Sequence, residues 1–411
     1  MPAASSPEPS SQAPPDPHAR RTLAAASVNH ALHDGYTDLI YVLLPVWQGE
    51  FGLGYTALGL LKALYSGALA AFKLPASALA RRLGTRTVLA LGTALSAGGY
   101  AAAGASGGLV GLCVALAIAG IGSGTQHPLA SAVIARAYGG RARGPLGTYN
   151  FAGDVGKAAV PPTVGFLLAF ADWRTSMWAV AGLGLVVAAL LTFTLPPARA
   201  RQVPDAAAGV PAAVRQGREM RRDGTGFPIL VAIGMLDNAA RPAFLLYLPF
   251  LLREKGAALT TIGLALSAVF VGGALGKAVC GWLGERLGVT RTVLLTESGT
   301  AALILAAIVL PLVPALIILP LLGVMLNGTS SVLYGTVPEL APNGQVERAF
   351  ALFYTWTLGG SAVAMPLLYG PLGDVFRPSW AATASAATAL AAVPLMLALS
   401  GRLPPGSSRR V

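Results

Sequence analysis

Charged side chains are scarce in this sequence, and their scarcity excludes an ordinary soluble domain. Only 11% of the residues are charged and 54% are hydrophobic, and the mean hydropathy is +0.64. Soluble domains usually contain about 25% charged residues. The lipid bilayer is therefore the solvent for which this chain is built.

Cysteine is almost absent, and three functional motifs are missing. The two cysteines, Cys113 and Cys280, lie in different apolar segments, which argues against a disulfide framework and a thiolate metal site. There is no P-loop, so ATP does not drive the protein directly. No nucleophile–base motif is present, so we predict no enzyme, no cofactor and no resident metal. The net charge of +12 fits arginine-rich cytoplasmic loops, and we predict no nucleic-acid partner.

Apolar runs of about 20 residues recur along the chain, each long enough to cross a membrane as a helix. The predicted spans are 23–48, 56–80, 87–106, 109–135, 144–170, 174–195, 227–252, 258–283, 291–312, 314–337, 347–371 and 378–400. We predict an all-α membrane protein with twelve transmembrane helices in two six-helix bundles. Its parts are a disordered cytoplasmic tail (1–22), the N-terminal bundle (23–195), a cytoplasmic linker (196–226), the C-terminal bundle (227–400) and a second tail (401–411).

Arginine marks one side of the predicted membrane protein. The tails, the linker and the connections after even-numbered spans hold most of the arginines, whereas the opposite connections hold only Arg174, Arg253, Lys255 and Arg377. Because cytoplasmic loops collect Lys and Arg, both termini are predicted to be cytoplasmic. The first 22 residues have no apolar core and do not read as a signal peptide. We expect a bacterial inner membrane location.

The two halves of the sequence repeat when one is shifted by 204 positions. The shift pairs Gly59 with Gly263, Gly84 with Gly288, Gly156 with Gly360, and Pro162 with Pro366. Six-helix halves in the same orientation predict two bundles related by a pseudo-two-fold axis along the membrane normal.

This layout resembles the major facilitator superfamily. The segments "LARRLGTRTVL" and "LGERLGVTRTVLL" are similar to the family's loop between helices 2 and 3 and its copy between helices 8 and 9. The resemblance implies a conformational latch at the cytoplasmic ends, formed by Arg82, Arg86, Glu285 and Arg286. The stretches "HALHDGYTDLIYVLLPVW" and "GIGSGTQHPLASAVIARAYGG" resemble the fosmidomycin-resistance-like branch, although its members have neutral residues where Lys62, Lys73 and Lys157 stand.

Nine of the charged side chains inside the predicted spans are candidates for a transport pathway. They are Lys62, Lys73, Lys157, Lys277, Arg241, Asp34, Asp38, Asp154 and Asp237. Each unpaired charge would cost about 2.5–3.5 kcal/mol at the centre of a membrane helix. They must therefore form structural ion pairs, line a wet cavity, or both. Asp154 and Lys157 are spaced to pair locally within one helix.

The repeat places two of these lysines symmetrically, because Lys73 shifted by 204 falls on Lys277. Two cations flanking a cavity would hold an anion by charge-assisted hydrogen bonds, and Arg241 could add a bidentate fork. The substrate is predicted to be a small organic anion or zwitterion. The predicted substrate residues are Lys73, Lys277, Arg241, Lys157, Asn150, Tyr354 and Trp356, the last two by stacking.

One face of the first span carries His30, Asp34 and Asp38 at helical spacing. Buried carboxyls beside cations can exchange protons and partners. His127 precedes Pro128, which can bend the fourth span, although a purely structural histidine is an equal alternative. The predicted proton-coupling residues are Asp34, Asp38, Asp154, Asp237 and His127.

These features predict a secondary active transporter that works by alternating access, coupled to protons and acting in efflux as a monomer. The prediction of efflux rests on "AAVPPTVG", which is similar to a Gly/Pro motif of antiporters in the superfamily. Two rivals stay open. One is a divalent-metal exporter that uses His30, His33, Asp34, Asp38, His127 and Asp154 as ligands. The other is a non-transporting receptor of the same fold.

Overall fold

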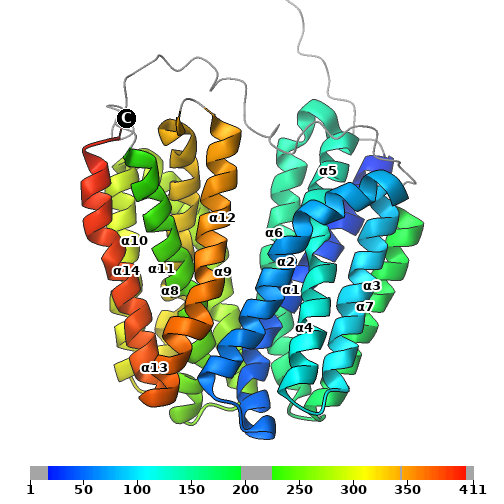
Figure 1. Ribbon diagram of the computed structural model, residues 1–411, viewed down its shortest axis with the longest axis horizontal. Helices are drawn as coiled ribbons and strands as arrows, with labels where there is room; N and C mark the ends of the chain where they lie inside the picture. The colour runs from blue at the N-terminus through cyan, green and yellow to red at the C-terminus, as the bar shows by residue number, and fades with distance from the viewer. Residues whose placement is uncertain (1–16, 196–224, 343–344, 404–411) are drawn as a thin grey trace, which may run out of the picture.

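The computed structural model describes residues 17–195, 225–342 and 345–403, and these residues form helices and no strands. The N-terminal bundle consists of α1 (Pro17–Phe51), α2 (Tyr55–Leu83), α3 (Thr85–Gly104), α4 (Leu109–Gly124), α5 (Gln126–Tyr138), α6 (Arg143–Leu167) and α7 (Trp173–Thr194). The C-terminal bundle consists of α8 (Gly226–Glu254), α9 (Leu259–Leu287), α10 (Val289–Val309), α11 (Leu312–Thr336), α12 (Val346–Ala364), α13 (Gly370–Val375) and α14 (Pro378–Ser400). Figure 1 shows the two bundles side by side. The predicted fold class is confirmed.

Three features of the helices depart most from the prediction. Helix α1 begins at Pro17, inside the range expected to be a tail, because proline suits the first turn of a helix. The fourth span is divided at Thr125 into α4 and α5, so that Pro128 lies in the first turn of a new helix and breaks no helical hydrogen bond. The eleventh span contains a π-helical segment, Met365–Tyr369, between α12 and α13. The rest of the predicted first tail, most of the linker and most of the second tail lie outside the described residues.

Nine of the described segments are apolar and long enough to cross a membrane by composition alone. The three helices that fall short are α1, α3 and α6. Helices α1 and α6 contain the histidines, aspartates and lysine described below, and α3 is rich in alanine, glycine and threonine. The least apolar helices of the N-terminal bundle are thus those with polar residues to bury against other protein.

Reciprocal contacts between the bundles support the predicted repeat. A Cβ atom at Gly59 of α2 would lie 3.5 Å from Cα of Pro366. The equivalent Gly263 of α9 would place its Cβ 2.8 Å from Cα of Pro162 in α6. The turn glycines Gly84 and Gly288 also match, because both have positive φ, 90° and 81°. Such paired contacts are what a pseudo-two-fold axis between the bundles requires.

The bundles meet at one end of the molecule and diverge towards the other (Figure 1). We call the end where α1 ends and α2 begins the distal end, and the end where α1 begins and α14 ends the terminal end. At the distal end the Asp374 carboxylate accepts hydrogen bonds from the backbone N–H groups of Tyr55 (2.5 Å) and Thr56 (3.0 Å). The Arg253 guanidinium donates to the carbonyl oxygen of Pro45 at 3.2 Å. The distal end is therefore closed by contacts between the two bundles.

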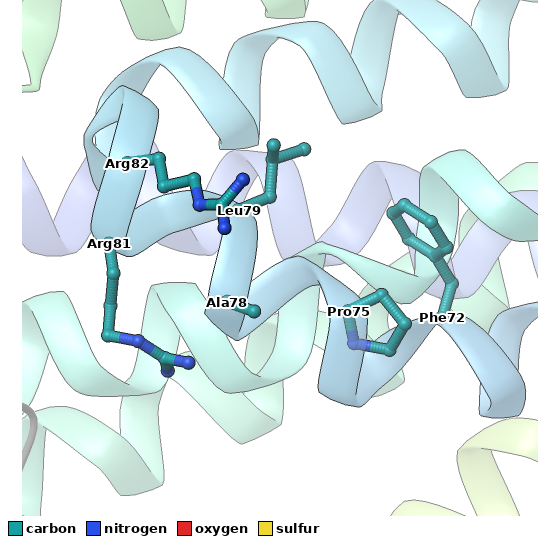
Figure 2. A pocket seen from close by; sticks show the side chains of 6 residues that line it. All are labelled: Phe72, Pro75, Ala78, Leu79, Arg81 and Arg82. Carbon is teal, nitrogen blue, oxygen red and sulfur yellow. The ribbon is translucent and has the colours of Figure 1, made fainter.

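The predicted latch lies at the terminal end. Among the described residues, none of Arg82, Arg86, Glu285 and Arg286 forms an ion pair, and the Arg286 guanidinium stacks on the ring of Trp282 at 4.3 Å. Arg82 lines a pocket of about 540 Å³ along α2 (Figure 2). The latch stays a prediction for a conformation in which this end closes.

Candidate functional site

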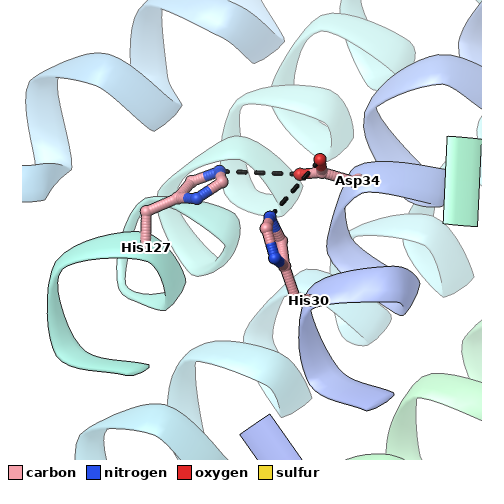
Figure 3. A group of neighbouring side chains, drawn as sticks. All are labelled: His30, Asp34 and His127. Carbon is pink, nitrogen blue, oxygen red and sulfur yellow. Dashed lines mark ion pairs between the residues drawn. The ribbon is translucent and has the colours of Figure 1, made fainter. Parts of the chain in front are cut away.

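Asp34 on α1 is the hub of a polar cluster inside the N-terminal bundle. Its carboxylate lies 3.4 Å from His30 Nε2, 3.5 Å from His127 Nε2 and 3.2 Å from Lys157 Nζ. Figure 3 shows the two imidazoles pointing at this carboxylate from α1 and α5. The break between α4 and α5 begins a new helix just before His127, which orients its side chain towards α1. Three predicted site residues, Asp34, His127 and Lys157, thus lie together.

The hydrogen bonds of His30 fix how its ring faces Asp34. Nδ1 lies 2.7 Å from the carbonyl oxygen of Tyr149, and this oxygen can only accept, so Nδ1 bears a proton. In the neutral ring Nε2 then holds a lone pair, and it is a buried atom with no hydrogen-bond partner. The ring also stacks on Tyr149, with centroids 4.1 Å apart. Nε2 faces the Asp34 carboxylate at 3.4 Å, so the two groups attract each other only with a proton between them.

His33 belongs to a separate network that packs helices together. Nδ1 lies 3.0 Å from Ser123 Oγ and Nε2 lies 3.0 Å from Thr93 Oγ1, with the side chain almost fully buried. Both ring nitrogens are therefore used, which is the arrangement of a structural histidine. His33 is not available as a metal ligand in this arrangement.

A second buried pair lies one turn further along α1. The Lys62 ammonium is 3.9 Å from the Asp38 carboxylate and donates to the Thr37 carbonyl oxygen at 2.5 Å. It also lies 4.4 Å from the ring centroid of Tyr41. Lys62 was not among the predicted site residues, although a lysine within a span was the signal that could have included it.

Charged groups of the two bundles meet across the interface. The Lys277 ammonium of α9 donates to the Asp154 carboxylate of α6 at 2.5 Å. Lys277 also interacts electrostatically with Lys157 and Asp34 of the N-terminal bundle. Asp154 and Lys157 interact electrostatically, but each forms its ion pair with a residue on another helix. The side chains of α6 that share a face are thus divided between two partners.

The two symmetric lysines have different surroundings. Among the described residues, no carboxylate forms an ion pair with Lys73, although it interacts electrostatically with Asp34 and His127. The repeat explains the difference, because the position equivalent to Asp154 is Leu358. Lys73 is half-buried on α2 and is therefore a cation without the counter-ion that Lys277 has.

Arg241 and Asp237 occupy the C-terminal bundle. Arg241 Nη2 lies 3.5 Å from Asp237 Oδ2, and the guanidinium donates to the side-chain oxygens of Asn238 and Asn327 at 3.3 and 3.4 Å. Asp38 of α1 interacts electrostatically with Arg241 across the interface. The sequence prediction missed Glu297, an almost fully buried acid on α10 that interacts with Asp237.

The remaining predicted substrate residues are exposed. Asn150 lies on an exposed face of α6. Tyr354 is 44% exposed and stacks on Tyr334 with centroids 5.1 Å apart. Trp356 is 56% exposed and lies about 200° around α12 from Tyr354, at 100° per residue. The two aromatic side chains therefore cannot both face one cavity.

The sequence family described as Major Facilitator Superfamily matches residues 27–251 and again residues 230–411. The chain belongs to the major facilitator superfamily. The two matched ranges of this superfamily member together span residues 27–411.

Solved transporters have the same fold as this superfamily member. A bacterial homologue of the human lysosomal transporter Spinster, in an inward-facing and unoccupied conformation, is similar at a TM-score of 0.78 and 15% identity, covering 96% of this chain and all of that one. A D-xylose–proton symporter has a TM-score of 0.76 and 16% sequence identity, and the match covers 96% of this chain and all of that one. A nucleoside transporter has a TM-score of 0.74 and 13% sequence identity, and the match covers 93% of this chain and 99% of that one. No curated protein matches the sequence. At these identities the likeness concerns the fold alone, and the fosmidomycin-resistance-like branch stays a prediction.

Proposed function

We propose that this superfamily member is a proton-coupled secondary transporter of a small organic anion, with its substrate site between the two bundles. The observation that carries the proposal is an excess of cations among the charged residues of α1, α2, α6 and α9, which we call the central cluster. It contains four lysines, Lys62, Lys73, Lys157 and Lys277, and three aspartates, Asp34, Asp38 and Asp154. Lys62, Lys157 and Lys277 each have an aspartate partner, whereas Lys73 has no ion pair among the described residues. An unpaired ammonium in a membrane interior is costly, and a bound anion would supply the missing charge.

The anion would bind where groups of both bundles can reach it. Lys73 of α2 would donate to it directly, and His127, 40% exposed at its side chain, lies close enough to interact with Lys73. Lys277 could join by exchanging Asp154 for the substrate, since its own side chain is 46% exposed. Charge-assisted hydrogen bonds to an anionic group are stronger than those to neutral groups.

Alternating access would then change the contacts that join the bundles. The distal end is closed by Asp374 and Arg253, whereas the terminal end has no ion pair at the predicted latch in the described residues. Rocking of the bundles about the central cluster would open the first set and close the second. The Asp154–Lys277 bridge would be exchanged during this motion, because its partners belong to different bundles.

Asp34 is proposed to carry a coupled proton. It is surrounded by His30, His127 and Lys157 within 3.5 Å, so a proton can pass between carboxylate and imidazole without crossing lipid. Efflux remains the predicted direction. Anion-loaded proteoliposomes with an imposed pH gradient would determine both direction and coupling.

A thermal-shift screen of the purified protein with organic anions and phosphonates tests the site. An anion should raise the melting temperature of the wild type, and Lys73→Gln should weaken its binding by roughly 10- to 100-fold, the worth of a hydrogen bond to a charged group. Lys255→Gln is the control. Lys255 binds the carbonyl oxygens of Ile308 and Leu310 at the distal end, so its loss should lower the baseline and leave the shift intact. Equal shifts in the wild type and Lys73→Gln would refute the site.

A divalent metal ion as substrate is the second candidate. His30, Asp34 and His127 offer ligand atoms that all lie within 4.8 Å of one another. The bond from His30 Nδ1 to a backbone carbonyl oxygen is also the usual orientation of a metal-bound imidazole. Lys157, 3.2 Å from Asp34, opposes a cation there. Stabilisation by Zn²⁺ or Co²⁺ that disappears in Asp34→Asn would favour this candidate over the anion.

A further inference from the structure

The C-terminal bundle contains a second titratable cluster that the proposed anion site does not use. Asp237 of α8 is 4% exposed and Glu297 of α10 is 2% exposed. The two carboxyl groups interact electrostatically with each other, and both interact with Arg241. Two buried acids thus share a single, partly buried cation.

The hydrogen bonds of this cluster are incomplete. Within the part of the chain that the structure describes, Asp237 Oδ2 and Arg241 Nε are buried atoms without a hydrogen-bond partner, although Oδ2 lies only 3.5 Å from Arg241 Nη2. Buried polar atoms are normally satisfied, and an exception indicates a group whose pairing changes or a ligand that is not seen. A proton is the smallest such ligand, and a protonated carboxyl gains a donor that an ionised one lacks.

Among the described residues, Arg241 is the cation that interacts with both carboxyl groups. Helix α11 contributes the hydroxyl groups of Thr329, beside Glu297, and Tyr334, beside Asp237 and Arg241. Helix α14, which packs on α8 and α10, contains no charged residue in its sequence. Helix α1 brings Asp38 to Arg241, but Asp38 is itself paired with Lys62 of α2. Lys277 of α9 interacts with groups of the N-terminal bundle and with neither carboxyl group. With both acids ionised, the cluster would hold a net negative charge inside the membrane.

We propose that Asp237 and Glu297 bind one proton between them, with Arg241 as the counter-charge of the acid that stays ionised. One proton makes the cluster neutral, as burial in lipid favours. Like charges in one buried site cannot easily both be present, so the acids titrate as a pair. Arg241 interacts electrostatically with Asp38 of the other bundle. The charge of the Asp237–Glu297 pair therefore influences the interface between the bundles. Its use as a coupling proton rests on the proposed function, whereas the binding of the proton does not.

Infrared spectroscopy of the protein in lipid at neutral pH tests this without any substrate. A protonated carboxyl group gives a C=O band that shifts in D₂O. Sharing predicts that Glu297→Gln and Asp237→Asn each remove the same one-carboxyl band, because either variant leaves one acid facing Arg241. Arg241→Met should about double the band, since both acids then need protons. Glu50→Gln is the control, because Glu50 is an exposed partner of Arg174 at the distal end, and this variant should leave the band unchanged.

The outcomes separate the proton site from the transport proposal. A band that persists in both Glu297→Gln and Asp237→Asn, or one that only one of them removes, would overturn the shared proton. If either variant does not fold, the Arg241→Met spectrum decides, because an unchanged band there also overturns the proposal. If no anion stabilises the protein in the thermal-shift screen, the proposed substrate is refuted. The infrared result on the proton site is not affected by that outcome.

Discussion

The contact between Gly263 of α9 and the paired prolines of α6 should control opening of the distal end. A Cβ atom at position 263 would lie 2.8 Å from Cα of Pro162 and 2.9 Å from the carbonyl oxygen of Pro161. Both are backbone atoms of the opposite bundle, so no side-chain rotation can relieve the clash in Gly263→Ala. Overpacking of this kind costs about 1–3 kcal/mol. The closed state alone bears that cost, so the population open at the distal end should rise about 5- to 150-fold.

Spin labels on cysteines at Ala105 and Glu254, which follow α3 and end α8 at the distal end, would measure this change as a distance distribution. The labels belong in a background without the native cysteines. Gly263→Ala should add a longer distance. Gly281→Ala on the same helix is the matched control, because no atom lies within 4 Å of its Cβ position, and it should leave the distances unchanged. Identical distributions for both variants would show that the bundles are not held together here.

Three further predictions concern polar contacts. Asp374→Ala removes the acceptor of two N–H groups at the start of α2, so it should weaken distal closure by about 1 kcal/mol and add the same longer distance; no change would contradict the cap. A double-mutant cycle of Asp154→Asn and Lys277→Gln should give a coupling of about 1 kcal/mol or less that falls with salt, because Lys277 is 46% exposed; zero coupling at low salt would contradict the bridge. The pKa of Asp172, the cap of α7, lies below its ordinary value because the backbone and hydroxyl of Thr175 donate to it. Its stabilisation is present above the unfolded pKa and lost as pH falls through the folded one, so Asp172→Ala should lower the melting temperature at neutral pH and flatten its acid dependence.

Helix number, bundle division and repeat could be predicted because lipid imposes them on the sequence. In lipid, the backbone hydrogen bonds of each span must form within its own helix, and its side chains must be apolar. Each span is therefore visible in the sequence as a long apolar run. Where two helices approach closely, only glycine fits, and Gly59 and Gly263 occupy equivalent close contacts in the two halves. Boundaries were harder, because proline permits a helix start as well as a break: Pro17 begins α1, and Pro128 lies in the first turn of α5.

The partners of the charged residues could not be predicted from periodicity. Helical spacing placed Asp34 and Asp38 on one face of α1, and both face polar partners. It could not tell that Lys157 would reach α1 while Asp154 reached α9, because the choice depends on how α6 is rotated between two neighbours. Glu297 was missed although it stands inside a span, where any acid calls for an explanation.

Positions that match between the two halves and positions that differ serve different roles in this fold, the first in motion and the second in recognition. Four of the positions that obey the 204-residue shift, Gly59 with Gly263 and Pro162 with Pro366, lie where the bundles touch. Several charged positions break the shift, although Lys73 and Lys277 keep it: Asp154 has Leu358 as its equivalent, and Thr37 has Arg241. A rocking motion needs equivalent surfaces on both sides of the axis, whereas a bound solute has no such symmetry. The broken positions are therefore where substrate and proton specificity should be changed by mutation, and Leu358→Asp, which would give Lys73 the partner that Lys277 has, should abolish anion binding without disturbing the bundle contacts.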